Sequence, residues 1–114
     1  MSFSAIQAPD EAWPRPRHVV VTEDTLSVDL EDGRTISVPV EWYPRLAHAT
    51  LEERQRWELG AAGIHWQEID EDISVRGLLL GRKSSESKKS FQRWLAHRAK
   101  GEKPWLEPGY KMGD

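Results

Sequence analysis

The sequence contains no cysteine, and this absence excludes disulfides and thiolate metal sites. It also has no apolar run near the roughly 20 residues that a membrane-spanning helix needs. No basic region followed by an apolar stretch is present near the N-terminus, so we expect no secretory signal. These absences predict a cytoplasmic protein that does not enter a membrane.

Motifs of the common enzyme classes are missing as well. There is no phosphate-binding glycine loop, no histidine pair at helical metal-ligand spacing and no serine in a nucleophile-elbow context. A general base needs an orienting partner, and we expect His48 and His65 to be hydrogen-bonded framework residues instead. An enzyme would require a pocket in which these histidines or the carboxylates of residues 68–72 converge. We therefore predict a protein that is not an enzyme, with no catalytic residue, cofactor or metal ion.

The densest acidic cluster consists of Glu68, Asp70, Glu71 and Asp72. A hard cation such as Mg²⁺ or Ca²⁺ accepts such oxygens, but a calcium loop also needs a turn glycine and a distal glutamate, which this spacing lacks. We expect Asp70 or Asp72 to cap backbone amides ahead of a helical turn near 74–80, where negative charge is favourable.

Charged residues make up 31% of the chain and hydrophobic residues 38%, which predicts one small globular domain. Six tryptophans help to fill its core, because each can bury a large apolar area. We expect Trp57, Trp66 and Trp94 in the core. Trp13 and Trp105 belong to terminal segments, where aromatics are common interface anchors. A homodimer in which the arm or the tail crosses to a neighbour explains these two, and so does packing within one chain.

Apolar and polar residues alternate along much of residues 18–40, which predicts strands of an antiparallel sheet. The loop of the second hairpin decides the register. A three-residue loop at 31–33 places Val28 opposite Ile36 and keeps the apolar side chains on one face, whereas a two-residue loop splits them. We therefore predict the longer loop, with Gly33 in its left-handed position.

A helix is predicted after Thr50. Thr50 and Glu53 have the spacing of a capping box, in which each side chain accepts a hydrogen bond from the other residue's backbone amide. We expect this helix to run to about Leu59 and to end at Gly60.

Three further elements follow. We expect a strand near 64–66 and a short helical turn that Ser74 caps and that ends at Gly81. The last helix is predicted to begin at a Ser85 cap and to end before Gly101, because glycine commonly follows the last helical residue.

The last helix has two different faces at 100° per residue. One face is apolar and consists of Phe91, Trp94, Leu95 and Ala99. The opposite face is cationic and consists of Lys89, Arg93, His97 and Lys100, with Arg82 and Lys83 leading into it. The usual meaning of such a stripe is a solvated helix face, but it also suits contacts with phosphates or with an acidic protein.

The net charge of −3 conceals an asymmetry. Residues 1–81 carry seven lysines and arginines against 15 acidic residues, whereas residues 82–103 carry eight against two. Segments of opposite sign indicate either a charged partner or a basic segment that folds back on its own acidic body.

Several segments together resemble one protein family. They are the Glu-Asp-Gly turn at 31–33, Trp42–Leu46 followed by Ala47–Thr50, Gly63–Trp66, the acidic stretch at 69–74, and Gly77–Gly81. Over residues 18–81 this combination resembles the bacterial domain-of-unknown-function family numbered 2442, with one departure at Gln67, where such sequences often carry proline. The resemblance implies a small α+β domain. Some members are encoded in arrangements that look like toxin–antitoxin pairs or are joined to helix-turn-helix segments, which implies binding and regulation more than chemistry.

The sequence thus predicts an α+β fold with a small antiparallel sheet that starts as a β-meander, a middle helix, and a C-terminal amphipathic helix packed on the sheet. Its parts are an extended proline-rich arm (1–17), a core domain (18–81), the basic helix (82–101) and a tail (102–114).

The predicted function is that of a non-enzymatic, antitoxin-like binding protein that engages a protein partner or a second copy. The alternative is a nucleic-acid-binding accessory protein that uses the same basic helix. The predicted partner-binding residues are Arg82, Lys83, Lys89, Arg93, His97, Lys100, Trp13 and Trp105.

Overall fold

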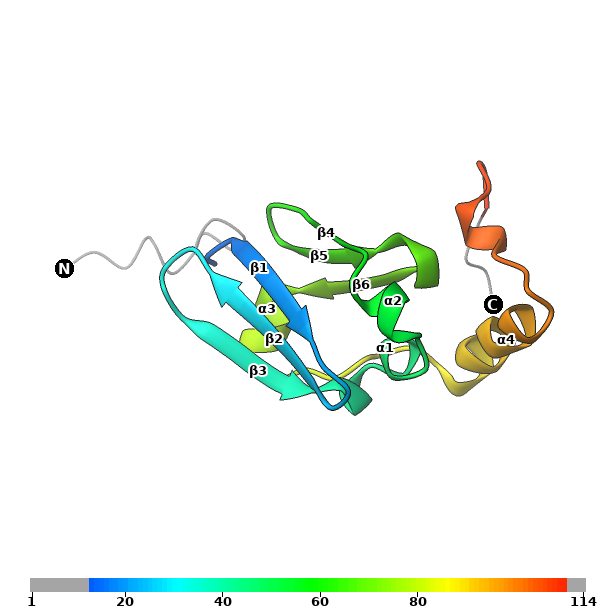
Figure 1. Ribbon diagram of the computed structural model, residues 1–114, viewed down its shortest axis with the longest axis horizontal. Coiled ribbons are helices and arrows are strands. Elements are labelled where there is room, and N and C mark those ends of the chain that lie inside the picture. Colours follow the sequence, from blue (N-terminus) through cyan, green and yellow to red (C-terminus); the bar gives the residue numbers. More distant parts are fainter. Residues whose placement is uncertain (1–12, 111–114) are drawn as a thin grey trace.

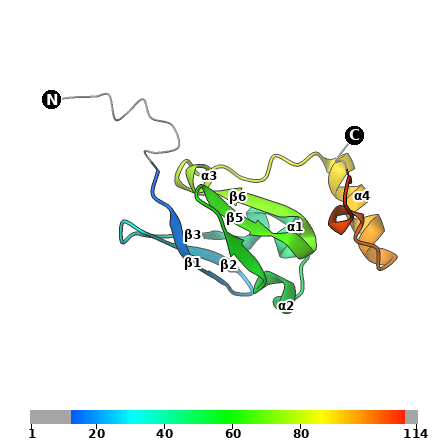
Figure 2. The same cartoon turned by 90° about the horizontal axis from the view of Figure 1, so that it is seen from above.

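The protein has an α+β fold, seen in a computed structural model that describes residues 13–110. Two antiparallel sheets of three strands each lie one above the other, and a separate helix stands at one end of the molecule (Figures 1 and 2). The predicted fold class is therefore confirmed, although the sequence indicated one sheet and the structure has two. Residues 1–12 of the predicted arm and 111–114 of the predicted tail lie outside the described residues.

The first sheet contains β1 (Pro16–Val21), β2 (Thr25–Leu30) and β3 (Thr35–Pro39), in that order. Its second hairpin has the predicted three-residue loop, because Val28 pairs with Ile36. Gly33 occupies the left-handed position of this loop with a φ of +96°. The observed register keeps the apolar residues of both strands on one face, which is the reason for which the longer loop was predicted.

The second sheet contains β4 (Trp57–Leu59), β5 (Gly63–Trp66) and β6 (Glu71–Ser74), in that order. The strand predicted near 64–66 is confirmed, and it begins at Gly63. The acidic β6 was not predicted, because aspartate and glutamate are depleted in strands.

The helix after Thr50 is shorter than predicted. The capping box between Thr50 and Glu53 is present, but α2 spans only Leu51–Arg54. The prediction that the helix reaches Leu59 was wrong, because Trp57–Leu59 pairs with β5 instead. Tertiary pairing has here outweighed the local helical pattern.

The remaining short helices connect the strands. They are η2 (Val40–Trp42), α1 (Pro44–Ala47), η3 (Gln67–Ile69), α3 (Val75–Leu79) and η4 (Pro104–Leu106). Ser74 caps α3 as predicted, since its hydroxyl accepts a hydrogen bond from the Gly77 amide. The prediction that Asp70 or Asp72 caps backbone amides ahead of this turn was wrong. Their carboxylates contact Arg45 and His65 instead.

The last helix, α4, spans Lys88–Ala99, so the boundaries predicted for the basic helix were wrong at its start. Ser87 is the N-cap rather than Ser85. Residues 82–87 form a non-helical segment, which we call the connector, between α3 and α4. Gly101 follows the helix with a φ of +71°, as predicted. Figure 2 shows α4 beyond one end of the two sheets rather than across a sheet face.

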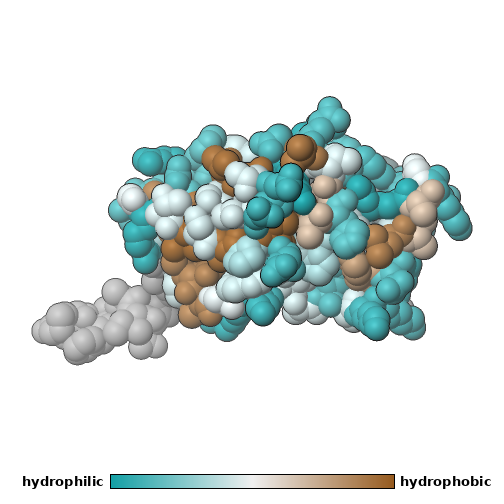
Figure 3. All heavy atoms as spheres, turned by 60° about the horizontal axis from the view of Figure 1, so that its bottom comes forward, coloured by the Kyte–Doolittle hydropathy of each residue, from teal (hydrophilic) through white to brown (hydrophobic). Residues whose placement is uncertain are grey.

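One apolar core joins the two sheets, α1, α3 and α4. The core contains Trp66 and Trp94, which are 0% and 2% exposed, whereas Trp57 is half-buried at its margin. Figure 3 shows hydrophilic side chains over much of one face, with apolar side chains gathered over the sheet half of the molecule and a smaller apolar group at the α4 end. Within residues 13–110 no helix has the length and apolar character needed to cross a membrane.

Candidate functional site

Helix α4 is fixed to the core by a small number of directed contacts. The Trp94 indole N–H donates to the Ile69 carbonyl oxygen at 3.0 Å. The Arg98 guanidinium lies 4.8 Å from the centre of the Trp94 ring and donates to both carboxylate oxygens of Glu53, at 3.0 and 2.9 Å. These contacts fix the second half of α4 on the body.

The carboxylate of Glu53 is strongly stabilised in its ionised form. Burial alone would raise its pKa, but the hydrogen bonds from Arg98 and the Thr50 amide outweigh burial and lower the pKa to about 2. Lys103 adds a further positive charge, with its Nζ 3.6 Å from Glu53. Part of the basic segment therefore folds back on the acidic body, as one of the two interpretations of the charge asymmetry predicted.

A second buried arginine fixes the connector. Arg45 is 5% exposed, and its Nε donates to the Glu86 carboxylate at 2.9 Å. Its Nη1 donates to the Asp70 carbonyl oxygen at 2.9 Å. The Ser90 hydroxyl donates to the same Glu86 carboxylate at 2.7 Å. Arg45 thereby ties the η3–β6 corner to the connector and to the first turn of α4.

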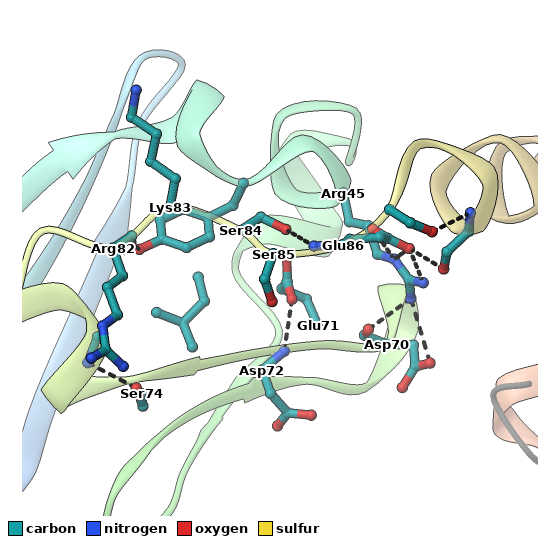
Figure 4. A pocket seen from close by; sticks show the side chains of 15 residues that line it. Arg45, Asp70, Glu71, Asp72, Ser74, Arg82, Lys83, Ser84, Ser85 and Glu86 are labelled. Carbon is teal, nitrogen blue, oxygen red and sulfur yellow. Dashed lines mark hydrogen bonds and ion pairs between the residues drawn. The ribbon is translucent and has the colours of Figure 1, made fainter. Parts of the chain in front are cut away.

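A polar groove of about 650 Å³ lies between β6 and the connector (Figure 4). Arg82, Lys83, Ser84 and Ser85 lie along its connector side, and Glu71 extends from β6 into the space between. We call this feature the β6 groove. The connector side of this groove is held in place by the Tyr43 hydroxyl, which donates to the Arg82 carbonyl oxygen at 3.0 Å.

Glu71 is the unusual ionisable group of the β6 groove. Burial raises the pKa of its carboxyl to about 7, although the Asp72 amide and the charge of Arg45 act in the opposite direction. One carboxylate oxygen accepts a hydrogen bond from the Asp72 amide at 3.0 Å. No histidine is among the groove-lining residues that the structure describes. The groove therefore contains a carboxyl whose pKa lies near neutral pH.

The acidic residues predicted as a cluster separate into different contacts. Glu68 pairs with Lys103 at 2.7 Å, Asp70 faces Arg45, and Asp72 faces His65 at 2.8 Å. Within residues 13–110 no group of three or more histidines and carboxylates has an arrangement that could hold a metal ion.

The predicted cationic residues divide into two groups. Arg82, Lys83 and Lys89 are exposed, and so is Lys88, which the helical wheel did not single out. We call these four residues the cationic surface; they occupy the connector and the first turn of α4. Among the described residues no carboxylate lies within 4.0 Å of any of their charged groups, and the Lys83 amino group lies 5.4 Å from the centre of the Trp42 ring.

The other predicted partner-binding residues lie elsewhere. His97 accepts or donates a hydrogen bond with Glu102 at 3.0 Å and meets the Trp105 ring edge-on. The Trp105 indole N–H donates to the Glu68 carbonyl oxygen, and its ring stacks on Trp94, so packing within the chain accounts for it. Arg93 is half-buried, Lys100 is exposed at the far end of α4, and Trp13 is half-buried ahead of β1. The eight residues do not form one continuous surface.

Sequence reasoning missed Arg45 and Lys88, and it named Glu71 only as a member of the acidic cluster. The roles of Arg45 and Glu71 carry no local signal, because they depend on burial against residues distant in the chain. Lys88 was available from the sequence, since it adjoins Lys89 in the first helical turn.

Comparison with known proteins identifies a family for the two-sheet part of the chain and assigns no reaction to it. No curated protein matches the chain. A crystal structure of a protein of unknown function from Rhodospirillum rubrum is 30% identical, with a TM-score of 0.56, and the match covers 64% of this chain and 93% of that one. A solution structure of an uncharacterised protein from Chromobacterium violaceum is 22% identical, with a TM-score of 0.61, covering 83% and 85% of the two chains.

The family match itself extends over residues 16–84. It includes both sheets, α3 and the start of the connector, and it ends before α4. The chain therefore belongs to the family of proteins of unknown function designated DUF2442.

Proposed function

We propose that the protein is a non-enzymatic binding protein whose cationic surface docks an acidic surface of a protein partner. One observation supports the proposal above all others. Arg82, Lys83, Lys88 and Lys89 are exposed, and among residues 13–110 none of them has a carboxylate within ion-pair distance. Charges placed in this way do little for the fold and are available to a partner.

The rest of the basic segment provides the contrast. Arg98 and Lys103 are engaged with Glu53 and Glu68 and hold α4 and the tail on the body. Apart from those internal pairs, positive charge is concentrated on the connector and the first turn of α4. Rim charges of this kind mainly steer association and orient the partner.

An acidic protein suits this surface better than nucleic acid does. The chain has a net charge of −3, and residues 1–81 carry most of its acidic groups. A nucleic-acid backbone carries closely spaced charges along its whole length, so it would meet the negative field of that body over a longer stretch than a local acidic patch of a protein would. Nucleic acid remains the second candidate, because four cations lie within eight consecutive residues. The family resemblance implies an antitoxin-like role. Such a role is one regulatory case of the first candidate, which is binding to an acidic protein partner.

The first experiment compares two equal charge changes. The Lys88→Glu/Lys89→Glu variant reverses two charges on the cationic surface, and the Arg15→Glu/Arg17→Glu variant reverses two exposed charges ahead of and within β1. Each tagged protein is used for affinity purification from its native cells, with quantitative mass spectrometry. We expect a particular acidic protein to be recovered with the wild type and the β1 control but lost with the α4 variant. Equal recovery with all three proteins would contradict the proposal.

A second experiment separates the two partner classes. Fluorescence anisotropy with a labelled DNA duplex and a labelled single-stranded RNA is measured at low and moderate salt. The proposal predicts no saturable binding to either probe. Binding that weakens steeply with salt and disappears in the α4 variant would replace the protein-partner proposal with the nucleic-acid alternative.

A further inference from the structure

Strand β6 has one paired edge and one edge that faces the β6 groove. In the described part of the chain it pairs only with β5. Just beyond the strand, the Val75 amide donates to the Ala62 carbonyl oxygen at 2.9 Å. Because paired residues in an antiparallel ladder alternate between bonded and non-bonded positions, this bond sets the pattern for β6. Asp72 and Ser74 therefore direct their backbone N–H and C=O groups away from β5.

Figure 4 agrees with this assignment. The Glu71 carboxylate lies on the connector side of β6 and accepts from the Asp72 amide, so that amide points into the groove. The Ser74 amide has no hydrogen-bond acceptor among the described residues. The β6 edge thus offers one amide occupied by a displaceable carboxylate and one amide without a protein partner.

The connector forms the opposite wall of the groove without pairing with β6. Its backbone amides at Arg82 and Ser84 donate to Gly77 and Trp42 instead. The contacts of Tyr43 and Arg45 described above hold it in place. The groove has a volume within the range of ordinary ligand sites, and one of its walls is an unpaired strand edge.

The other sheet edges are less suitable for an added strand. Strands β1 and β4 lie beside each other, with His18 and Trp57 in edge-on ring contact and the Gln55 amide donating to the Val21 carbonyl oxygen. The edge strand β3 ends in Pro39, which has no N–H to donate.

We propose that the outer edge of β6 binds an extended acidic segment of a protein partner, which lies in the β6 groove as an additional strand. The proposal rests on the proposed function and specifies how the partner is held. Main-chain hydrogen bonds to Asp72 and Ser74 supply affinity that does not depend on side chains. An acidic side chain at the Ser74 end of the segment reaches Arg82, which extends from the opposite wall toward Ser74, and this contact supplies the charge complementarity. The Lys83 side chain extends away from β6, toward the Trp42 ring.

Binding follows from a simple exchange of hydrogen bonds. A carbonyl oxygen of the incoming segment accepts from the Ser74 amide, which has no protein partner to lose. A second carbonyl replaces the Glu71 carboxylate as acceptor for the Asp72 amide. No bond of the β5–β6 ladder is broken, because both amides point away from β5.

The test removes one amide hydrogen and keeps everything else matched. Ser74 has a φ of −88°, which is close to the value that proline adopts, so Ser74→Pro deletes the amide with little distortion. The matched control is Ser74→Ala, which loses the same cap on α3 but keeps the amide. Thermal unfolding of both variants establishes that they remain equally folded.

The probe is a blocked synthetic peptide that alternates glutamate with valine and threonine, titrated while amide NMR shifts are recorded. We expect saturable binding, the largest shifts at Asp72 and Ser74, and roughly tenfold weaker affinity for Ser74→Pro than for Ser74→Ala. A peptide with N-methylated backbone positions should not bind. Equal affinities of the two variants, or no binding of the unmethylated peptide, would overturn the inference.

Two further outcomes separate this inference from the proposed function. If Arg82→Glu/Lys83→Glu abolishes binding of the partner while Ser74→Pro binds it as well as Ser74→Ala, the cationic surface functions and the β6 edge does not. Light scattering without peptide tests whether a second copy occupies the edge. A dimer in Ser74→Ala that is lost in Ser74→Pro would assign the edge to self-pairing and would overturn the inference.

Discussion

Arg98 of α4 and Glu53 of α2 form a two-point ion pair, in which the guanidinium donates to both carboxylate oxygens at 3.0 and 2.9 Å. The two residues are 45 positions apart, and only 9% of the Glu53 surface is exposed. The pair links α4, which lies outside the family match, to the domain that the family match covers. It thereby fixes the last turn of α4 to the body, whereas Arg45 and Glu86 hold the start of the helix.

Replacing Arg98 with methionine tests this link. The substitution keeps an apolar stem near Trp94 but leaves Glu53 without its two-point partner, so we expect a loss of about 2 kcal/mol in the free energy of unfolding. Amides of α4 should also exchange faster with solvent in the variant than in the wild type, whereas those of the sheets should change less. Urea unfolding and hydrogen exchange measure the two effects. The control is Arg56→Met, which removes exposed pairs and should cost about 0.5 kcal/mol or less; equal losses would contradict this role.

The pH dependence of stability should reveal Glu71. Burial raises the pKa of its carboxyl from 4.5 to about 7, so the folded state holds this proton more tightly than the unfolded state. Its contribution is fully present below about pH 4.5 and is lost as the pH rises toward 7. We expect on the order of 2 kcal/mol of stability to disappear across that interval. Glu71→Gln should flatten this slope in urea unfolding measured at several pH values; an unchanged slope would contradict the assignment.

Glu53 should produce the opposite slope at lower pH. Burial works against ionisation, but the hydrogen bonds from Arg98 and Thr50 prevail and lower the pKa of Glu53 to about 2. Its contribution is therefore present above about pH 4.5 and is lost as the pH falls toward 2. The Glu53→Gln variant should lose less stability than the wild type between pH 4.5 and pH 2. Acid unfolding followed by circular dichroism measures this, and parallel curves for both proteins would argue against it.

Gly63 should tolerate no side chain. A Cβ atom there would lie 2.4 Å from the Ile73 carbonyl oxygen and 2.9 Å from the Ser74 Cα, and both are backbone atoms of β6. We expect Gly63→Ala to cost about 2 kcal/mol or to displace β6. Gly60→Ala is the matched control, because its nearest contact is an ordinary 3.6 Å. Thermal unfolding measures the stabilities of the two variants. Similar stabilities would show that β5 and β6 lie farther apart at Gly63 than these distances indicate.

The parts of the fold that could be predicted were those with strong local signals. The hairpin register followed from alternation in β2 and β3, and the capping box at Thr50 followed from two residues at fixed spacing. The length of α2 could not be predicted, because Arg54 is 6% exposed and donates to the backbone oxygens of Leu46, Ala47 and Thr22. These bonds, together with the pairing of Trp57–Leu59 with β5, accompany the end of the helix at Arg54, where local propensity favours its continuation.

The start of α4 illustrates a different limit. Ser84, Ser85 and Ser87 are chemically equivalent as helix caps, so the sequence offers several starting points. The choice of Ser87 accompanies the burial of Glu86 against Arg45, which the sequence does not reveal.

The candidate site was predictable only in its charge. The sequence showed that residues 82–103 are basic, but both partner binding and folding back explained that fact. The structure divides the cations between the two, since Arg98 and Lys103 pair internally whereas Lys88 and Lys89 do not. The β6 groove could not be predicted, because β6 itself has an acidic composition that disfavours a strand.

The most direct test of the cationic surface is a charge-swap measurement with the identified partner. Isothermal titration compares the wild type, Lys88→Glu/Lys89→Glu, and that variant mixed with a partner whose facing acidic residues are changed to lysine. The account predicts binding that weakens with added salt, a loss of at least tenfold in the variant, and recovery of most of the affinity in the swapped pair. Unchanged affinity of Lys88→Glu/Lys89→Glu for the unmodified partner would contradict it.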